Sequence, residues 1–425
     1  MSAVFALGAF VLTLAFAAPA RGADVIYGVV PQDGALPTQD DLKLMPQGGI
    51  SSIRTILSWA TVENTQGTYD WSGTDEIVRQ TSSSGITMFP FIYGTPAWAA
   101  AIDKRKCEGY DCAVYPPKSA ATRDAFTRFA AAAAKRYGPG GAFWTVPIQK
   151  QSKQLQLQLV PCQPPLIVPP LCDDTEPPPD PPDPPPGDPT PTPTPVPPMP
   201  TPSPVDPSLP PCQCTVERPI MTWQIWNEQN SPKYFAPKVN VTSYAKMLKG
   251  AGNAIHEAVP GTDVILGGMW GPDSAKKVVL PVRPYLTKLY KVKGIERSFD
   301  SIALHPYSSS ADGALDALKV AESVVNKVGD RKVGSWITEI GWASGGPRDE
   351  PFNKGKTGQG KVLSEAYKGF KKKKGKYNLR GIYWYSWRDK PGGDLICAWC
   401  GHAGLRAKNG TAKPAWDAFV KATKR

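Results

Sequence analysis

Residues 220–230 read IMTWQIWNEQN, an apolar run that ends in Asn227 and Glu228. Apolar residues follow one another there with almost no polar alternation, which is typical of a strand buried on both faces, as in a parallel sheet. A second run of this kind, residues 336–342 (WITEIGW), carries Glu339 at the equivalent place. If both strands belong to one parallel barrel, the two glutamates meet at the carboxyl-terminal end of its strands, where barrel enzymes keep their chemistry. Two facing carboxylates predict acid/base and nucleophilic chemistry on a glycosidic bond.

Strand-like and helix-like segments alternate along most of the chain. This alternation over about 400 residues predicts an α/β fold, a single (β/α)8 TIM barrel, with a doubly wound sheet as the alternative. We expect strands at residues 25–31, 50–59, 86–93, 220–230, 263–270, 299–307, 336–342 and 381–387. We expect helices within residues 36–46, 70–84, 118–137, 243–259, 281–291, 313–328 and 360–374.

The composition changes abruptly between the third helix and the fourth strand. About half of the 47 prolines lie in residues 161–211, and such tracts favour polyproline II and cannot build a packed core. We therefore predict a disordered proline-rich insertion at residues 147–215, within a catalytic barrel that spans residues 24–425. It should leave from the face opposite the catalytic one. A cell-wall tether, spacer or partner-binding arm and a tolerated loop expansion are both open readings.

The first residues have the pattern of a secretory signal. An apolar run at residues 4–18 precedes Ala18-Pro19-Ala20, a small-residue cleavage site. We predict a signal peptide at residues 1–20 and a secreted or cell-wall location, although no Lys or Arg precedes the run. A membrane span is the alternative, but the run is short for a bilayer crossing.

The eight cysteines all follow the predicted signal, which fits an oxidising compartment. Proximity predicts two disulfides, Cys107–Cys112 and Cys397–Cys400. Four cysteines flank or lie within the proline-rich segment, and their connectivity stays open: Cys162, Cys172, Cys212 and Cys214. Zinc is the alternative for these four, but no histidine lies among them.

The net charge of +12 does not identify a nucleic-acid-binding protein, because the basic residues are scattered. Their densest run, residues 371–374 (KKKK), falls at the end of an expected helix, where cations favour the carbonyl end of the dipole. We interpret it as a solvated face. Adhesion to an anionic cell envelope or an acidic polysaccharide is the alternative.

Several segments together resemble glycoside hydrolase clan A, the retaining (β/α)8 enzymes, and within it the secreted actinobacterial members of the family 39 and family 5 type. The matching segments are Arg54, TWQIWNEQN (222–230), ALHPY (303–307), WITEIGW (336–342), YWYSWRD (383–389) and CGHAGLRAKNGTAKPAW (400–416). One departure is Gln229, which stands where the usual motif has proline. The resemblance covers the chain except for its first residues and its proline-rich segment.

The resemblance implies a role for each matching polar residue. Glu228 is the expected general acid/base and must hold its proton, whereas Glu339 is the expected nucleophile and must stay ionised. Arg54 would lie beside Glu339, and Asn227 would bind the sugar 2-hydroxyl. Retention requires the two carboxyl groups roughly 5 to 5.5 Å apart. The alternative is that both glutamates merely cap helices or bind structural arginines.

The resemblance also implies that His305 and Tyr307 line the sugar site and orient the nucleophile, and that Trp387 is the aromatic platform for the sugar. An internally bonded core residue is the alternative for the histidine, and a buried core position is the alternative for each tryptophan. Weaker candidates for stacking on sugar faces follow other strands: Trp59, Trp98, Trp270 and Trp342.

The sequence thus predicts a secreted, monomeric retaining glycoside hydrolase that acts on a poly- or oligosaccharide. It predicts no metal, no organic cofactor and no nucleic-acid partner. A cell-wall-associated binding or structural protein with an inactive barrel, and a transglycosylase using the same site, are the alternatives. The sugar and linkage are left open.

Overall fold

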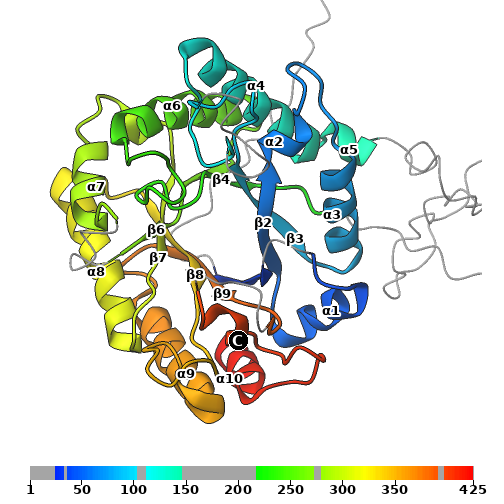
Figure 1. Ribbon diagram of the computed structural model, residues 1–425, viewed down its shortest axis with the longest axis vertical. Helices are drawn as coiled ribbons and strands as arrows, with labels where there is room; N and C mark the ends of the chain where they lie inside the picture. The colour runs from blue at the N-terminus through cyan, green and yellow to red at the C-terminus, as the bar shows by residue number, and fades with distance from the viewer. Residues whose placement is uncertain are drawn as a thin grey trace, which may run out of the picture. The chain divides into compact units, whose positions relative to one another are not determined.

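Parallel strands close into a barrel with helices outside it in the computed structural model (Figure 1). The structure describes residues 24–32, 36–102, 112–145, 217–271, 279–390 and 397–424. The chain divides into two units, and the second, residues 152–214, lies outside the described residues. The predicted signal peptide, the predicted insertion and the predicted Cys107–Cys112 pair also fall wholly or partly outside them, so these remain predictions.

The strands follow one another around the barrel in the order β5-β4-β3-β2-β1-β9-β8-β7-β6, and a β5–β7 pairing closes it. The pairings between these strands are parallel. Their bounds are β1 Ile26–Val30, β2 Ser52–Ser58, β3 Thr87–Tyr93, β4 Thr222–Ile225, β5 Asp263–Leu266, β6 Met269–Trp270, β7 Ser301–His305, β8 Gly334–Ile340 and β9 Leu379–Tyr385. The predicted (β/α)8 barrel is confirmed.

The fifth strand was expected to run without a break over residues 263–270, and this prediction is wrong. The structure has two short strands there, β5 and β6, separated by Gly267 and Gly268. A Cβ at Gly267 would lie 2.0 Å from Gln229 Oε1, and one at Gly268 would lie 2.0 Å from His305 Nε2. The two glycines therefore let polar side chains from the turn after β4 and from β7 approach the backbone at the point where the strand is interrupted.

The seven expected helices lie close to their expected positions, and α2, α5 and α10 were not expected. Their bounds are α1 Gln39–Leu44, α2 Trp59–Val62, α3 Ser72–Ser83, α4 Ala120–Tyr137, α5 Ala142–Thr145, α6 Val241–Ala258, α7 Val282–Leu289, α8 Ala311–Val328, α9 Gly355–Lys373 and α10 Pro414–Thr423. Local signals explain the ends: Ser119 forms a capping box with Thr122 before α4, and α8 runs from the N-cap Ser310 to Gly329, which has φ 80°.

The barrel interior is filled from six strands. Val30, Phe89, Ile265, Ala303, Trp336 and Tyr383 form one buried cluster. At the amino-terminal ends of the strands, the Asp263 carboxylate accepts hydrogen bonds from Arg380 at 2.7 Å and Ser301 at 2.8 Å. Burial raises the pKa of Asp263, and the charge of Arg380 opposes this. This end of the barrel is therefore closed by packing and an ion pair, which leaves the opposite end for a site.

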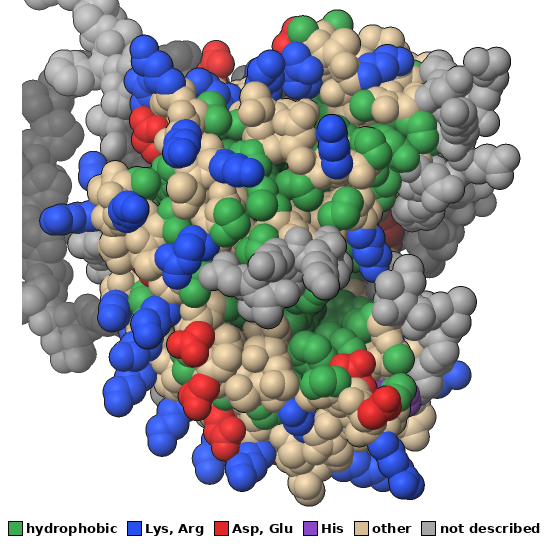
Figure 2. Space-filling model, turned by 60° about the vertical axis from the view of Figure 1, so that its left-hand side comes forward, with side chains coloured by type: hydrophobic (Ala, Val, Ile, Leu, Met, Phe, Trp, Pro, Cys, Tyr) green, Lys and Arg blue, Asp and Glu red, His purple; other side chains and the backbone are tan. Residues whose placement is uncertain are grey.

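Lys and Arg side chains are spread over the face shown in Figure 2, as expected from their scattered positions in the sequence. Among the described residues, none of the helices combines the length and apolar character needed to cross a membrane.

Candidate active site

Glu228 and Glu339 come together at the carboxyl-terminal ends of the barrel strands, with His305 between them. His305 Nδ1 lies 2.8 Å from Glu228 Oε1 and 3.5 Å from Glu339 Oε2. One oxygen of each carboxylate and one nitrogen of the imidazole all lie within 4.8 Å of one another. Two acidic residues that are far apart in the sequence are thus neighbours in one site.

The turn after β4 aims Glu228 into this site through an unusual backbone. Trp226 has φ 75° and Glu228 has φ 40°, values that non-glycine residues rarely adopt and that cost on the order of 1–3 kcal/mol each. Hydrogen bonds hold the turn: Trp226 N donates to Ile92 O at 2.9 Å, and Glu228 N donates to Gly268 O at 3.0 Å. The Trp226 ring is fully buried. Strain of this kind is typical of residues held for function.

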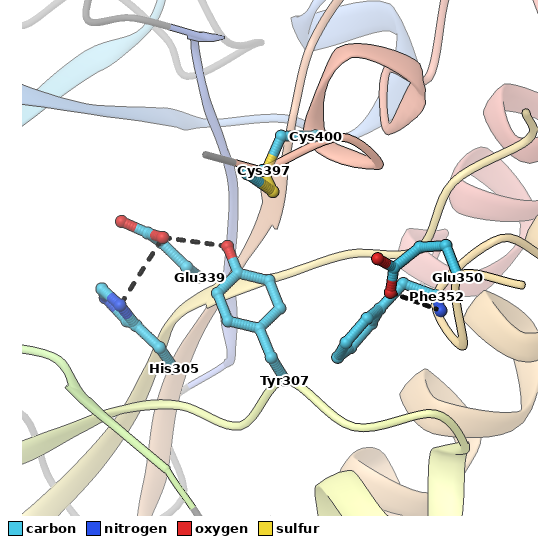
Figure 3. The surroundings of a disulfide bond; sticks show 7 residues. All are labelled: His305, Tyr307, Glu339, Glu350, Phe352, Cys397 and Cys400. Carbon is cyan, nitrogen blue, oxygen red and sulfur yellow. Dashed lines mark hydrogen bonds and ion pairs between the residues drawn. A yellow bond between two sulfur atoms is a disulfide. The ribbon is translucent and has the colours of Figure 1, made fainter. Parts of the chain in front are cut away.

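Glu339, on β8, has a donor on each carboxylate oxygen. Arg54 Nη1 lies 2.6 Å from Oε1. The Tyr307 hydroxyl donates to Oε2 at 2.9 Å, as Figure 3 shows. Burial alone would raise the pKa of Glu339, but the charges of His305 and Arg54 and these hydrogen bonds outweigh it and lower the pKa below its ordinary value. Glu339 is therefore held ionised at neutral pH.

Arg54 is buried, only 1% exposed, and donates hydrogen bonds to several residues of the site. Besides Glu339, its guanidinium donates from Nε to Gln224 Oε1 at 2.6 Å and from Nη2 to Asn227 Oδ1 at 2.9 Å. The Phe91 ring lies beneath it, 4.2 Å from Cζ to the ring centroid. Its charge inside a barrel strand is thus paired, and its planar fork fixes residues from β4 and β8 at once.

The same residues contain the donor types of a cation site, because Glu228, His305 and Glu339 converge. However, both oxygens of Glu339 already accept hydrogen bonds, one of them from a guanidinium. A cation at this point would compete with a positive charge that is already in place. The arrangement fits an ionised carboxylate held for reaction better than a metal ligand.

A cavity of about 600 Å³ opens over the two carboxylates. Its polar side includes Arg54, Asn227, Glu228 and Glu339. Aromatic side chains form much of the remaining wall: Phe91, Tyr234, Trp270, Tyr307, Phe352, Tyr385 and Trp399. A pocket of this size with convergent polar groups and aromatic walls suits a small number of sugar rings.

The structure brings most of the predicted polar residues together. Arg54, Asn227, Glu228, Tyr307 and Glu339 line the cavity. His305 is completely buried behind it and contacts both carboxylates, so it is an internally bonded histidine and a neighbour of the site at the same time.

The predicted tryptophans Trp387, Trp342 and Trp98 are not brought to this cavity. β9 ends at Tyr385, two residues earlier than expected, and Trp387 turns into the core, 1% exposed and edge-on to Trp416. Trp342 is fully buried and donates from Nε1 to Ser308 O, and Trp98 donates from Nε1 to Glu63 O. Their prediction as sugar platforms therefore does not fit their placement. Of the weaker candidates, Trp270 lines the cavity and Trp59 is fully buried.

Several residues of the site were not predicted from the sequence: Phe91, Gln224, Tyr234, Phe352, Tyr385 and Trp399. Two of them had a signal. Tyr385 lies two residues before Trp387 and so on the same side of an extended strand, and Trp399 lies between the two cysteines predicted to pair.

Comparisons with known proteins agree with this geometry. The family model described as Beta-galactosidase, glycoside hydrolase family 42, matches residues 35–101, which include β2, β3 and Arg54 but neither glutamate. No curated protein matches the chain by sequence.

Solved structures of glycoside hydrolases superpose on the chain at low sequence identity. A family 39 glycoside hydrolase from Bacteroides cellulosilyticus has a TM-score of 0.56 at 17% identity, covering 93% of this chain and 63% of that one. A β-xylosidase from Caulobacter crescentus has a TM-score of 0.56 at 16% identity, covering 95% and 68%. An intracellular xylanase from Thermoanaerobacterium saccharolyticum, in a complex with xylotriose, has a TM-score of 0.53 at 12% identity, covering 93% and 95%.

The chain thus spans somewhat less than two thirds of the length of the family 39 enzyme. The resemblance to clan A glycoside hydrolases is confirmed at the level of the fold, and by that fold the chain is a (β/α)8 barrel of the kind these enzymes share.

Proposed function

We propose that the protein is a retaining glycoside hydrolase that cleaves an O-glycosidic bond, most simply a β bond, of a poly- or oligosaccharide. Glu228 is its general acid/base and Glu339 its nucleophile. The observation that carries the proposal is the close approach of the two carboxylates, with oxygens within 4.8 Å. That separation suits direct attack on an anomeric carbon, whereas inverting enzymes leave roughly 6.5 to 9.5 Å for a water molecule.

The donors around each glutamate support a division of roles. Arg54 and Tyr307 stabilise the negative charge of Glu339, which lets it attack the anomeric carbon while Glu228 gives its proton to the leaving oxygen. The covalent glycosyl-enzyme then loses its sugar to a water molecule, from which Glu228 removes the proton. The contact between His305 Nδ1 and Glu228 fixes the orientation of the acid/base through both steps.

Asn227 lies beside the nucleophile through its contact with Arg54, which suits an amide that binds the sugar 2-hydroxyl. The aromatic wall suits the apolar C–H faces of pyranose rings. Two of the three similar structures named above are a β-xylosidase and a xylanase solved with xylotriose, and this favours an oligosaccharide substrate for the present chain. Export, a cell-wall location and contact with the wall through residues 147–215 belong to the same proposal, as does a monomeric state.

The test begins with a panel of nitrophenyl glycosides and polysaccharides, followed by Glu339→Ala and Glu228→Ala in separate proteins. Both variants should lose at least about a thousandfold in kcat/KM on unactivated substrates. Azide should restore turnover of an activated substrate in both, with an inverted glycosyl azide from Glu339→Ala and a retained one from Glu228→Ala. The matched control is Glu365→Gln, an exposed carboxylate on α9.

Wild-type activity in either glutamate variant would end the assignment. Turnover without net release of free sugar would instead identify the transglycosylase alternative. Binding of polysaccharide without any turnover by the wild-type protein would favour the inactive-barrel alternative.

A further inference from the structure

A disulfide lies in the wall of the cavity that contains the two glutamates. Cys397 and Cys400 are bonded, with their Cα atoms 5.3 Å apart, within the usual range for disulfides. Both cysteines line the cavity that also contains Glu228 and Glu339, and Figure 3 places the disulfide beside Tyr307. The predicted Cys397–Cys400 pairing is therefore confirmed, and the disulfide lies in the active-site cavity.

The residue enclosed by this disulfide is Trp399, whose ring joins an aromatic cluster. It stacks on Phe352 with centroids 4.8 Å apart, and it meets the ring of Tyr307 edge-on at 5.3 Å. It also lies 6.3 Å from the ring of Tyr385. Trp399 is only 8% exposed, so these contacts bury most of its ring.

Tyr307 links this cluster to Glu339. Its hydroxyl donates to Oε2 at 2.9 Å, and burial together with the charge of Glu339 raises the pKa of Tyr307 well above its ordinary value. The phenol therefore stays protonated and remains a donor. Because Trp399 packs against the Tyr307 ring, the position of Trp399 helps to set where this hydroxyl points.

Backbone hydrogen bonds hold the residues that follow the disulfide. Beyond Cys400, Lys390 N donates to Gly401 O at 2.9 Å and Ser344 N donates to His402 O at 3.0 Å. These bonds fix the carboxyl-terminal side of the loop to the barrel. The disulfide, together with a hydrogen bond from Cys400 N to Cys397 O at 3.1 Å, ties Cys397 to that fixed turn, so that both ends of the segment carrying Trp399 are constrained.

We propose that the Cys397–Cys400 disulfide is a redox-sensitive positioning element of the active site. It holds Trp399 against Tyr307 and so keeps the Tyr307 hydroxyl on Glu339. A dithiol reductant that enters the cavity transfers two electrons: its thiolate attacks one sulfur, its second thiol resolves the mixed disulfide, and two protein thiols and a cyclic disulfide result. Opening the loop weakens the hydrogen bond to Glu339, and oxidation restores it.

The direct test measures the ionisation of Glu339 and needs no turnover. In protein labelled at the glutamate carboxyl carbon, the Glu339 resonance is assigned by its loss in Glu339→Gln and titrated by NMR. We expect the pKa of Glu339 to rise by about one unit on reduction with dithiothreitol, and to return on reoxidation. Tyr307→Phe should give a similar rise without reductant. An unchanged titration on reduction would overturn the proposal.

A second measurement uses the activity and therefore rests on the proposed function. Reduction should lower kcat/KM about tenfold near neutral pH and move the acid limb of its pH profile upward, whereas Cys397→Ser/Cys400→Ser should already have the reduced activity and ignore dithiothreitol. This double variant is the matched control for effects of reductant on other cysteines. A response to dithiothreitol in the double variant would assign the effect elsewhere.

The substitutions Trp399→Ala and Trp399→Phe separate positioning from general loosening. With the disulfide intact, Trp399→Ala should reproduce the raised pKa of Glu339, and Trp399→Phe, which keeps an aromatic ring against Tyr307, should recover most of the wild-type value. Equal titration curves for wild type and Trp399→Ala would contradict the inferred route. If the oxidised wild type cleaves no glycoside, the proposed function fails, but the NMR titration still decides this inference.

Discussion

Replacing Arg54 tests how the site holds a buried negative charge. Arg54 is 1% exposed and donates to Glu339, Gln224 and Asn227 at 2.6 to 2.9 Å. Arg54→Met keeps much of the side-chain volume but leaves Glu339 without its guanidinium and two amide oxygens without their donors. Breaking a buried ion pair from one side costs about 3–5 kcal/mol, so we expect a loss of unfolding free energy of that order at pH 7.

The sign of the pH dependence follows from Glu339. Its pKa in the folded protein is depressed, so its ionisation contributes stability that is present above the unfolded-state pKa and lost as the pH falls through the folded-state value. Without Arg54 the folded-state pKa rises, and this contribution disappears. The stability gap between wild type and Arg54→Met should therefore be widest near pH 7 and narrow toward pH 3.

Urea denaturation at pH 7, 5 and 3.5 measures this gap, because the linear extrapolation returns an unfolding free energy at each pH. Arg54→Lys, which keeps the charge but lacks the planar fork, should lose less stability at pH 7 while losing much of its activity. Lys356→Met, at an exposed position near the start of α9, is the matched control for removal of a cation. A gap of the same size at all three pH values would refute the reasoning.

Three further predictions concern other parts of the barrel. Tyr307→Phe should raise the acid limb of the kcat/KM profile by about one pH unit, because the carboxylate of Glu339 loses a donor that lowers its pKa; a pH–rate profile with an unmoved limb would contradict this. Trp270→Ala should raise KM roughly threefold to tenfold, because it removes part of the aromatic wall of the cavity. Trp387→Ala should lower the unfolding free energy by about 3–5 kcal/mol with little change in KM, because Trp387 is packed in the core. Steady-state kinetics and urea denaturation of both variants measure these effects, and finding the two effects exchanged would contradict the placement of the two tryptophans. Burial raises the pKa of Glu322, on α8, to about 7, so the stability that its protonated form contributes is present below its ordinary pKa of 4.5 and lost as the pH rises through 7. Glu322→Gln should therefore have an unfolding free energy about 1–2 kcal/mol above that of wild type at pH 8, and little above it at pH 5. Equal gains at both pH values in urea denaturation would be evidence against a carboxyl group whose ionisation is opposed by burial.

The barrel and its two glutamates could be predicted because their signal is strong and local. Apolar runs such as residues 220–226 and 336–342 are typical of strands buried on both faces, and a carboxylate at or near the end of such a strand indicates a functional site. Arg54 was predictable for the same reason, since a charge within a buried strand requires a partner. The structure supplies that partner as Glu339.

The aromatic wall could not be predicted, for a physical reason. Barrel strands are buried on both faces, so their sequences do not alternate, and nothing in the pattern separates a tryptophan that faces the cavity from one that faces the helices. Trp387 and Trp342 look like Trp270 in sequence, yet the first two are buried in the core and the third lines the cavity. Strand ends matter as well: a two-residue difference at the end of β9 places Tyr385 at the cavity wall and Trp387 in the core.

Loop residues of the site were also beyond the sequence. The Cys397–Cys400 pairing followed from proximity, but its place beside Tyr307 depends on how residues 397–400 pack against the segment that follows β7. Phe352 reaches the same wall from the segment between β8 and α9. Contacts between such distant segments depend on tertiary packing, which local patterns do not encode.

In the proposed mechanism, Glu339 forms a covalent bond to the sugar while Glu228 acts as the acid/base. The most direct measurement is to incubate the protein with a 2-deoxy-2-fluoro glycoside of the best substrate in the panel, and to find the labelled peptide by mass spectrometry. We expect a single adduct on Glu339, which forms in the wild type, is absent from Glu339→Ala, and disappears when an acceptor sugar releases the enzyme. An adduct on another carboxylate, or turnover that releases an inverted sugar with no adduct at all, would contradict the account.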